Sequence, residues 1–186
     1  MKIRLSSSEI QRDSIVDGEG IRSVIWTQGC IHNCLGCHNP ETHSFTEGCL
    51  VDLKILKDQI SKLEGQDGIT FSGGDPMEQA EACAELAKYS KELGLNVWCY
   101  TGYTWEELLK KAKHFPKIKE FLKYIDVLVD GKFIIDLKSY DVKFRGSKNQ
   151  RLIDVKKSLE KDEVILFEKN EVVTTKNGRK NHYMYV

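Results

Sequence analysis

Short apolar segments alternate with helical patterns along this chain, and that alternation limits its possible folds more than any other feature. Four segments predict strands, at 21–28, 68–72, 95–100 and 125–130, because each is short and rich in β-branched or aromatic residues. Glycine or a glycine pair follows most of them. Such alternation is typical of β-α units on a parallel sheet, in which right-handed crossovers curl successive units in one direction.

The segments between these strands carry helix start and stop signals. Leucine and isoleucine spaced three and four residues apart predict an amphipathic helix over 50–63. Asp75 suits an N-cap, Pro76 a first helical position and Glu78 a capping-box partner, for a helix that stops at Gly94. Two further helices are expected to begin at Thr104 and Pro116.

The predicted fold class is α/β, an open partial (β/α) barrel. A complete eightfold barrel needs about 250 residues, whereas this chain has 186. No repeat or linker is apparent, so one domain is expected over 1–186. Ligands bind beyond the carboxyl ends of the strands in such sheets. Those ends hold the cysteines at 30–37, the Ser-Gly-Gly-Asp run at 72–75, Thr101-Gly102 and Asp130-Gly131-Lys132.

Charge argues against two classes of partner. Lys plus Arg and Asp plus Glu number 28 each, so nothing favours long-range attraction to nucleic acid or to an anionic membrane. The first ten residues are charged and have no apolar core, unlike a signal peptide. The longest stretch without acidic or basic residues, 23–40, contains His, Asn, Gln and Pro and does not suit a membrane span. We therefore expect a cytoplasmic protein with no nucleic-acid or membrane partner.

Three of the six cysteines form the pattern Cys30-x3-Cys34-x2-Cys37. This spacing would suit one face of a helix, but the glycines, asparagine and proline within 29–40 lower helix stability, so a loop is expected. Disulfides are disfavoured, because there is no secretion signal and the cysteines are clustered. The remaining three cysteines are scattered singly at 49, 83 and 99, and buried free thiols explain them.

Three close thiolates suit a soft metal. The spacing alone is compatible with two kinds of site, a structural zinc and an iron–sulfur cluster. A structural zinc needs a fourth ligand, which His32, His38 or His43 would supply. An iron–sulfur cubane normally takes four cysteines, so three would leave one iron open. An open position is a liability in a structural site and a requirement in a reactive one, which favours the cluster.

The run Ser72-Gly73-Gly74-Asp75 ends one predicted strand and opens a helix. Glycine lets backbone approach a ligand closely, and a helix start offers unpaired N–H groups to a carboxylate. Asp75 would hold an ammonium group, so the run suits the polar end of an amino acid. A tight turn with an N-cap aspartate explains it equally well. A dinucleotide site is disfavoured, because no G-x-G-x-x-G follows a strand.

Together these motifs resemble the radical S-adenosylmethionine superfamily, in which C-x3-C-x2-C follows the first strand and a Gly-Gly-acidic motif follows the second. The chain resembles more closely the activating enzymes of anaerobic (class III) ribonucleoside-triphosphate reductases. The blocks that carry this resemblance are 17–22 (DGEGIR), 27–42 (TQGCIHNCLGCHNPET), 71–76 (FSGGDP), 100–104 (YTGYT), 126–133 (DVLVDGKF) and 144–151 (FRGSKNQR). They predict a core over about 15–155 and assign no function to 156–186. Gly36 replaces a commonly aromatic residue, which leaves open what shields the cluster there.

The resemblance implies a radical S-adenosylmethionine barrel with one [4Fe–4S] cluster. Cys30, Cys34 and Cys37 would hold the cluster, and the amino and carboxylate groups of S-adenosylmethionine would chelate its fourth iron. The residues expected at that cofactor are Ser72, Gly73, Gly74, Asp75, Thr101, Asp130 and Lys132. An ordinary surface ion pair explains Asp130 and Lys132 as well.

The resemblance also implies a reaction and partners. An electron from flavodoxin or ferredoxin would cleave the cofactor to methionine and a 5′-deoxyadenosyl radical, which takes a hydrogen from one glycine of the reductase. The loop of Asp17, Gly18, Glu19 and Gly20 would meet that partner, although a plain turn explains it equally well. Alternatives are an activase of another glycyl-radical enzyme, such as pyruvate formate-lyase, a radical enzyme for a small molecule, or a zinc-stabilised interaction domain.

Overall fold

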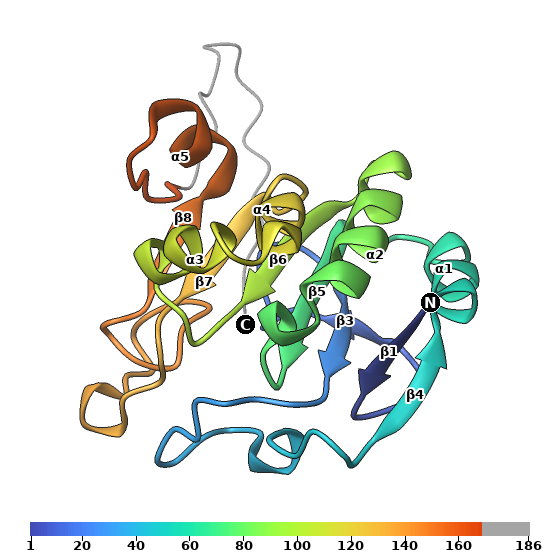
Figure 1. Ribbon diagram of the computed structural model, residues 1–186, viewed down its shortest axis with the longest axis horizontal. Helices are drawn as coiled ribbons and strands as arrows, with labels where there is room; N and C mark the ends of the chain where they lie inside the picture. Colours follow the sequence, from blue (N-terminus) through green and yellow to red (C-terminus); the bar gives the residue numbers. More distant parts are fainter. Residues whose placement is uncertain (169–186) are drawn as a thin grey trace, which may run out of the picture.

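The computed structural model describes residues 1–168, which form one sheet of eight strands (Figure 1). Four strands at its centre are parallel neighbours: β3 (Arg22–Thr27), β5 (Gly68–Gly73), β6 (Asn96–Tyr100) and β7 (Val127–Asp130). These are the four strands that the sequence predicts, and their parallel order is confirmed.

The sheet is mixed rather than all parallel, and it is open within the described residues. Four short antiparallel strands flank the centre: β1 (Lys2–Leu5), β2 (Gln11–Ser14), β4 (Cys49–Asp52) and β8 (Arg151–Asp154). The order runs β4-β1-β3-β5-β6-β7-β8, with β2 on β3. The sequence missed these strands because four residues, often polar, show too little alternation. The α/β class is confirmed.

Helices cover one face of the sheet (Figure 1). They are α1 (Leu53–Ser61), α2 (Ala80–Glu92), α3 (Trp105–Ala112), α4 (Pro116–Leu122) and α5 (Val155–Lys161), with short 3-10 turns η1 (Pro40–Thr42), η2 (Pro76–Gln79) and η3 (Ile135–Leu137). The capping box of Thr104 and Glu107 at α3 is confirmed. None of the helices described has the length and apolar character that crossing a bilayer requires.

Two predicted helices begin later than expected. The helix predicted over 50–63 begins only at Leu53, where the Asp52 side chain accepts a hydrogen bond from Lys54 N, and the residues before it form β4. Asp75 caps the 3-10 turn η2 and the α-helix follows from Ala80. The capping-box role of Glu78 is wrong, because its carboxylate accepts hydrogen bonds from side chains of other elements.

The two faces of the sheet have different cores. The face under the helices holds the main apolar core, with Phe71 of β5 and Phe121 of α4 packed edge to face at 5.3 Å. The opposite face holds a smaller aromatic cluster around Trp98, which packs against Phe144 and Phe167. Within residues 1–168, the side chains that pack on this second face include Phe144 and Phe167, which lie outside the helices.

Two loops meet at the carboxyl end of the parallel strands (Figure 1). The cysteine loop (residues 28–48) joins β3 to β4, and the β7–β8 loop (residues 131–150) returns the chain to the sheet edge. The single-domain prediction for 1–186 extends past the described residues and stays a prediction. The segment 156–186, to which the sequence assigns no function, lies partly outside them.

Candidate functional site

Backbone hydrogen bonds fix the cysteine loop at both of its ends. The N–H groups of Gly29 and Cys30 donate to the carbonyls of Thr42 and His43 at 2.8 and 3.1 Å. The Gln28 side-chain amide donates to two further carbonyls of the loop at 2.9 Å. No helix forms between β3 and η1, and Gly29, Asn33 and Gly36 have positive φ. The predicted loop conformation is therefore confirmed.

The turn at 72–75, called here the strand-end turn, packs directly on this loop through backbone. Gly74 N–H donates to Thr27 O and Asp75 N–H donates to Gly29 O, both at 2.8 Å. A Cβ on Gly74 would overlap the backbone of Gly29, with 2.8 Å to its carbonyl carbon. Gly73 has φ +101° and equally little room against Thr27. Both glycines are therefore required by close approach, and the N–H groups of Gly74 and Asp75 are used within the chain.

One cavity joins most of the residues predicted for the site. The thiols of Cys30, Cys34 and Cys37 line it from the cysteine loop, and the carboxyl ends of β5, β6 and β7 line it from the sheet. The sheet contributes Ser72, Gly73, Gly74, Tyr100, Thr101, Gly102 and Gly131, with Phe133 and Gln150 from the β7–β8 loop. Segments far apart in sequence thus meet at the strand ends, as the fold class predicts.

The thiols lie in surroundings that disfavour a free thiolate. Burial raises the pKa of Cys30 to about 11, with the Asp75 carboxylate adding to it and backbone N–H groups of the loop opposing it. Burial also raises the pKa of Cys34, although the backbone of Phe133 and the charge of Lys132 oppose the shift. A bound cation would offset this cost, because metal coordination favours the thiolate form.

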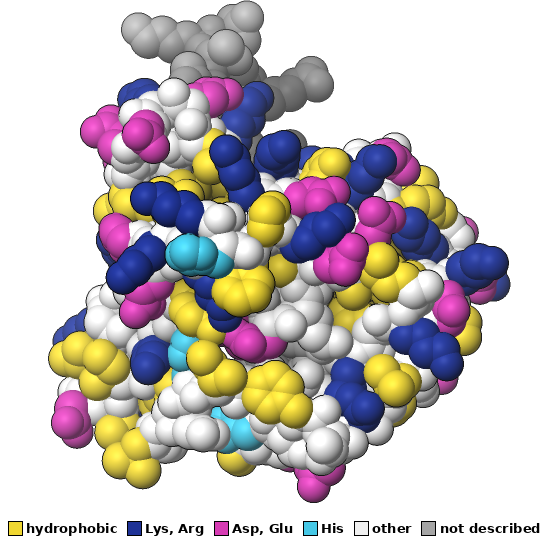
Figure 2. All heavy atoms as spheres, in the orientation of Figure 1, with side chains coloured by type: hydrophobic (Ala, Val, Ile, Leu, Met, Phe, Trp, Pro, Cys, Tyr) yellow, Lys and Arg dark blue, Asp and Glu magenta, His cyan; other side chains and the backbone are white. Residues whose placement is uncertain are grey.

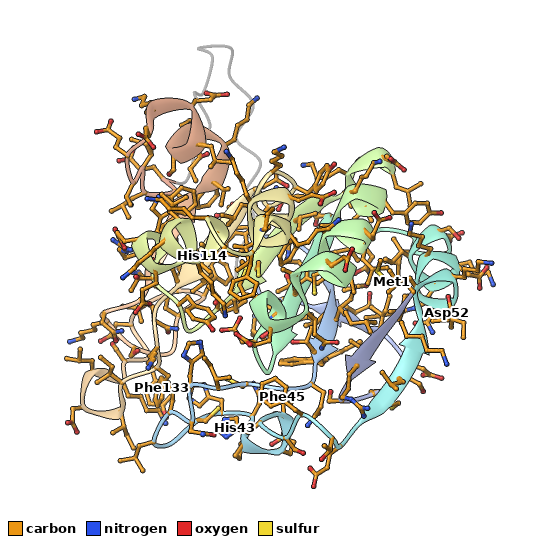
Figure 3. The ribbon with its side chains drawn as sticks, viewed as in Figure 1. Met1, His43, Phe45, Asp52, His114 and Phe133 are labelled. Atoms are coloured by element: carbon orange, nitrogen blue, oxygen red, sulfur yellow. The ribbon has the colours of Figure 1, made fainter. Side chains whose placement is uncertain are left out.

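The β7–β8 loop packs against the cysteine loop at Gly36. A Cβ on Gly36 would lie 2.7 Å from the Ile135 side chain and 3.6 Å from the Phe133 ring. That ring also packs on His38 at 4.8 Å between centroids. Figure 3 shows Phe133 at the meeting of the two loops. An aromatic ring from position 133 thus lies close to position 36, which a pattern search within the cysteine motif could not find.

Asp75 faces inward rather than into the cavity. Its carboxylate is buried and accepts hydrogen bonds from the Thr101 hydroxyl, the Gly102 N–H and Met77 N–H, each at about 3 Å. His32 of the cysteine loop is 2.8 Å from the same carboxylate. Asp75 does not line the cysteine cavity, and the predicted Thr101 is its hydrogen-bond partner. The contact of Asp75 with an ammonium group stays a prediction.

Among the described residues, Asp130 forms its ion pair with Arg151 and not with the predicted Lys132. Asp130 is buried and accepts hydrogen bonds from Arg151 at 2.5 and 3.0 Å and from Trp105 N–H at 2.8 Å. Lys132 is exposed. Both line a neighbouring cavity with Glu106. Asp130 is thus paired with Arg151, a residue inside a recognised block to which sequence reasoning gave no role.

The loop of Asp17, Gly18, Glu19 and Gly20 lies at the other end of β3, before its first residue. The last three of these residues line a separate apolar cavity, together with Ile15, Ile21, Lys143, Phe144, Leu152 and Phe167. The Asp17 carboxylate accepts a hydrogen bond from the Ser14 hydroxyl at 2.5 Å. The structure does not bring this loop to the cysteine cavity.

The donor set fits an iron–sulfur cluster. Three thiols from one loop line the cavity, and glycine backbone lines its opposite side. Within residues 1–168, no three His, Cys, Asp or Glu side chains are placed to share a single metal ion. A cubane makes no such demand, because three of its irons would each take one cysteine and the fourth would be left open.

Comparisons with known proteins agree with this geometry. A family model described as a 4Fe-4S single cluster domain matches residues 16–153. The anaerobic ribonucleoside-triphosphate reductase-activating protein of Haemophilus influenzae is 35% identical over 144 residues, 73% of this chain and 89% of that relative. Its namesakes in Enterobacteria phage T4 and Escherichia coli K12 are 35% and 34% identical, covering 74% and 73% of this chain and 86% and 90% of the relatives. The chain belongs to this family.

Membership of the reductase-activating family confirms the resemblance drawn from the six blocks. The matched model spans the cysteine loop and the strand-end turn, and it stops one residue before the end of β8. Its description names a 4Fe-4S cluster and not zinc. The residues that would hold the cluster and its cofactor are assigned below.

Proposed function

We propose that this chain is an oxidoreductase that activates anaerobic ribonucleoside-triphosphate reductase by generating a glycyl radical on it. The observation that carries the proposal is the single cavity in which three thiols face the glycine backbone of a strand-end turn, in a chain of the activating family. The match covers about nine tenths of the length of two relatives, which are named as activating proteins of the anaerobic ribonucleoside-triphosphate reductase.

In this proposal Cys30, Cys34 and Cys37 hold one [4Fe–4S] cluster. The cluster, when bound and reduced by flavodoxin or ferredoxin, supplies the electron that cleaves S-adenosylmethionine to methionine and a 5′-deoxyadenosyl radical. The chain's own residues bring the three thiols and the backbone of Gly73 and Gly74 to the lining of one cavity. Phe133, a half-buried residue that lines the cavity, would limit the access of water to an oxygen-sensitive group there.

S-adenosylmethionine would lie against Ser72, Gly73 and Gly74, because side-chain-free backbone lets its methionyl end approach closely. Thr101 lines the same cavity, while Asp75 supports it from behind through Thr101 and Gly102. Lys132, whose charge acts on Cys34, is the cation available to a carboxylate near the cluster. Asp130 fixes the start of α3 and the position of Arg151 rather than reaching the cavity.

The reductase would contact the loop of residues 17–20 at the amino end of β3 with one part of its surface, and the loop that carries its reacting glycine would enter the cysteine cavity at the carboxyl end. Ile15 and Val16 beside that loop are each 71% exposed, which is unusual for aliphatic side chains and typical of a protein-binding surface. We further propose that the fold is a partial (β/α) barrel of the radical S-adenosylmethionine type in one domain, acting in the cytoplasm. The open sheet with four central parallel strands supports this assignment.

The decisive experiment mixes the anaerobically reconstituted chain with S-adenosylmethionine, a reductant and the reductase, and records an electron paramagnetic resonance spectrum. The expected result is a glycyl-radical doublet together with about four irons per chain. A doublet that forms on pyruvate formate-lyase but not on the reductase would contradict the assignment of the partner. A protein that binds one zinc and no iron would contradict the reaction itself.

A further inference from the structure

The Asp75 carboxylate has no acceptor position left for a ligand. An ionised carboxylate offers about four lone-pair positions on its two oxygens. Oδ1 accepts from Met77 N–H at 2.9 Å, and Oδ2 accepts from Gly102 N–H at 3.0 Å and lies 2.8 Å from His32 Nε2. The Thr101 hydroxyl bridges both oxygens at 2.9 and 3.0 Å. With the residue only 1% exposed, these partners account for its whole hydrogen-bonding capacity.

His32 is the partner that comes from the cysteine loop, where it stands between Cys30 and Cys34. Its side chain is 4% exposed, although the loop residues on either side of it, Ile31 and Asn33, are more open. A Cβ on Gly102 would overlap the His32 ring, so the backbone there passes directly against the imidazole. The short pair with Asp75 therefore ties the middle of the cysteine loop to the carboxyl ends of β5 and β6.

Tyr103 closes the other side of the imidazole. Its ring meets that of His32 edge to face, with centroids 4.5 Å apart. The Tyr103 hydroxyl donates to Glu78 at 2.5 Å, and Lys111 donates to the same carboxylate at 2.9 Å while lying 4.2 Å above the Tyr103 ring. Residues of η2 and α3 thus hold Tyr103 in place, and Tyr103 in turn restricts the His32 ring to one orientation.

Two roles of Asp75, as a ligand of S-adenosylmethionine or as a positioning residue, require different surroundings of its carboxylate. A ligand of the S-adenosylmethionine ammonium group needs a free oxygen at the cavity wall, and Asp75 is absent from the residues that line the cavity. A positioning residue needs burial and a firm partner on the cysteine loop, and His32 is that partner. Outer-shell hydrogen bonds orient metal ligands, and the His32–Asp75 pair would act one step further out, on the loop backbone that carries Cys30 and Cys34.

We propose that Asp75, His32 and Tyr103 form a latch that positions the cysteine loop for its cluster, so that Asp75 acts through His32 and not on S-adenosylmethionine. The inference rests on the proposed function only in its identification of the cluster. The latch itself consists of contacts within the chain. It gives the acidic residue of the Gly-Gly-Asp motif a role in cluster retention.

The first test follows loss of iron to a chelator from the reconstituted full-length protein. Asp75→Asn and His32→Ala should each speed the loss about 10-fold to 100-fold, the range for outer-shell partners of metal ligands. The double variant should lose iron no faster than the more affected single variant, because both substitutions break one interaction. His32→Gln places an amide where Nε2 lies and should restore much of the retention. Additive effects of the two substitutions would overturn the latch.

The second test reads the loop directly by hydrogen exchange in the full chain, before and after reconstitution. The amides of Gly29 and Cys30, bonded to Thr42 and His43, should exchange about tenfold faster in Asp75→Asn and His32→Ala, since the loop opens more often. Amides of β7 should be unchanged, which shows that the variants fold. Unchanged exchange at Gly29 and Cys30 would overturn the proposal.

The third test separates the two roles of Asp75 by the affinity for S-adenosylmethionine. In molecules that retain the cluster, Asp75→Asn should change the Kd of S-adenosylmethionine by less than about twofold. A Kd weakened about tenfold or more, with iron retention unchanged, would make Asp75 a direct ligand and end the proposal. Asp58→Asn, which breaks the exposed pair with Lys62 at 2.6 Å, is the matched control. Failure of the proposed function would appear instead in the unsubstituted protein, as absent iron or absent cofactor cleavage.

Discussion

The two ends of the parallel strands differ in the types of residues that surround them. At the carboxyl end, buried polar groups, thiols and glycine backbone interlock, and the Asp75 and Thr101 side chains are each 5% exposed or less. At the amino end, the loop of residues 17–20 borders an apolar cavity, and Ile15 and Val16 stand 71% exposed. Both ends use glycines at close approach, at Gly74 in the first and Gly18 in the second.

This difference matches what each end would hold. A small charged group needs donors fixed in advance, because reorganising them costs binding energy. A protein partner instead gains affinity from apolar side chains that lose water on contact. Figure 2 shows basic and acidic side chains interspersed over the helical face, so this face carries no large patch of a single charge. The comparison predicts that substitutions at one end leave the property of the other end intact.

Loss of a thiol should have the largest effect. Cys34→Ala removes one of three cluster ligands, so iron content and S-adenosylmethionine cleavage should both fall to background after reconstitution. Iron analysis and product chromatography measure this. Cys49→Ala is the control, because that half-buried thiol of β4 does not line the cysteine cavity and should leave both quantities unchanged. Full cleavage activity in Cys34→Ala would refute the three-thiol assignment.

A methyl group at the strand-end turn should have the next largest effect. In Gly74→Ala the new Cβ overlaps the Gly29 backbone, so either the turn or the cysteine loop must move. We expect the free energy of unfolding to fall by about 3 kcal/mol, as for other severe backbone clashes. Denaturant unfolding of the full chain measures the change. In Gly65→Ala, the control, the new Cβ has no atom within 4 Å. The free energy of unfolding should fall only by the cost of the left-handed φ of +69°, about 1–2 kcal/mol. Equal losses would show that the close approach is unimportant.

The sequence predicted the central sheet because its information is local there. Each of the four central strands is apolar and ends in a turn signal, and Thr104 with Glu107 marks one helix start. The flanking strands β1, β2, β4 and β8 depend on pairing with residues far along the chain, such as Lys2 with Asp52. Short polar segments become strands only when such a partner exists, and no periodicity within four residues reports it.

The sequence predicted which residues line the cysteine cavity better than it predicted the contacts that hold them in place. The cysteines and glycines form compact motifs, whereas His32 and Tyr103 meet only after folding, from positions 71 residues apart. Asp75 was assigned to the cofactor because an acidic residue after two glycines suggests a ligand. Its burial against Thr101 and Gly102 depends on the register of β5 beside β6, which the sequence alone does not reveal.

A change at the amino end should weaken the partner and spare the cluster. Ile15→Asp places a charge on the exposed apolar rim beside residues 17–20, and the KM for the reductase should rise about tenfold. Iron content and cleavage of S-adenosylmethionine without reductase should be unchanged. Ile55→Asp, on an exposed position of α1 far along the helical face, is the control. Loss of iron in Ile15→Asp would break the proposed independence of the two ends.

The smallest effect concerns the pH dependence of stability at the carboxyl end. Burial opposes ionisation of Glu78, but hydrogen bonds from Tyr103 and Lys111 outweigh it, so the pKa of this carboxyl lies below its ordinary value of 4.5. A lowered folded pKa means that the ionised group stabilises the fold above that ordinary value. The contribution disappears as the pH falls through the folded pKa.

Glu78→Gln should therefore lower the free energy of unfolding at neutral pH by about 1 kcal/mol, the scale of one buried hydrogen-bonded group. The difference from the unsubstituted chain should vanish well below pH 4.5, where both carry a neutral side chain. Urea unfolding at several pH values measures it. Glu85→Gln, in an exposed pair with Lys57 at 3.6 Å, should show almost no difference at any pH. A Glu78 difference that persists at low pH would mean that shape, not charge, holds Tyr103 against the His32 ring.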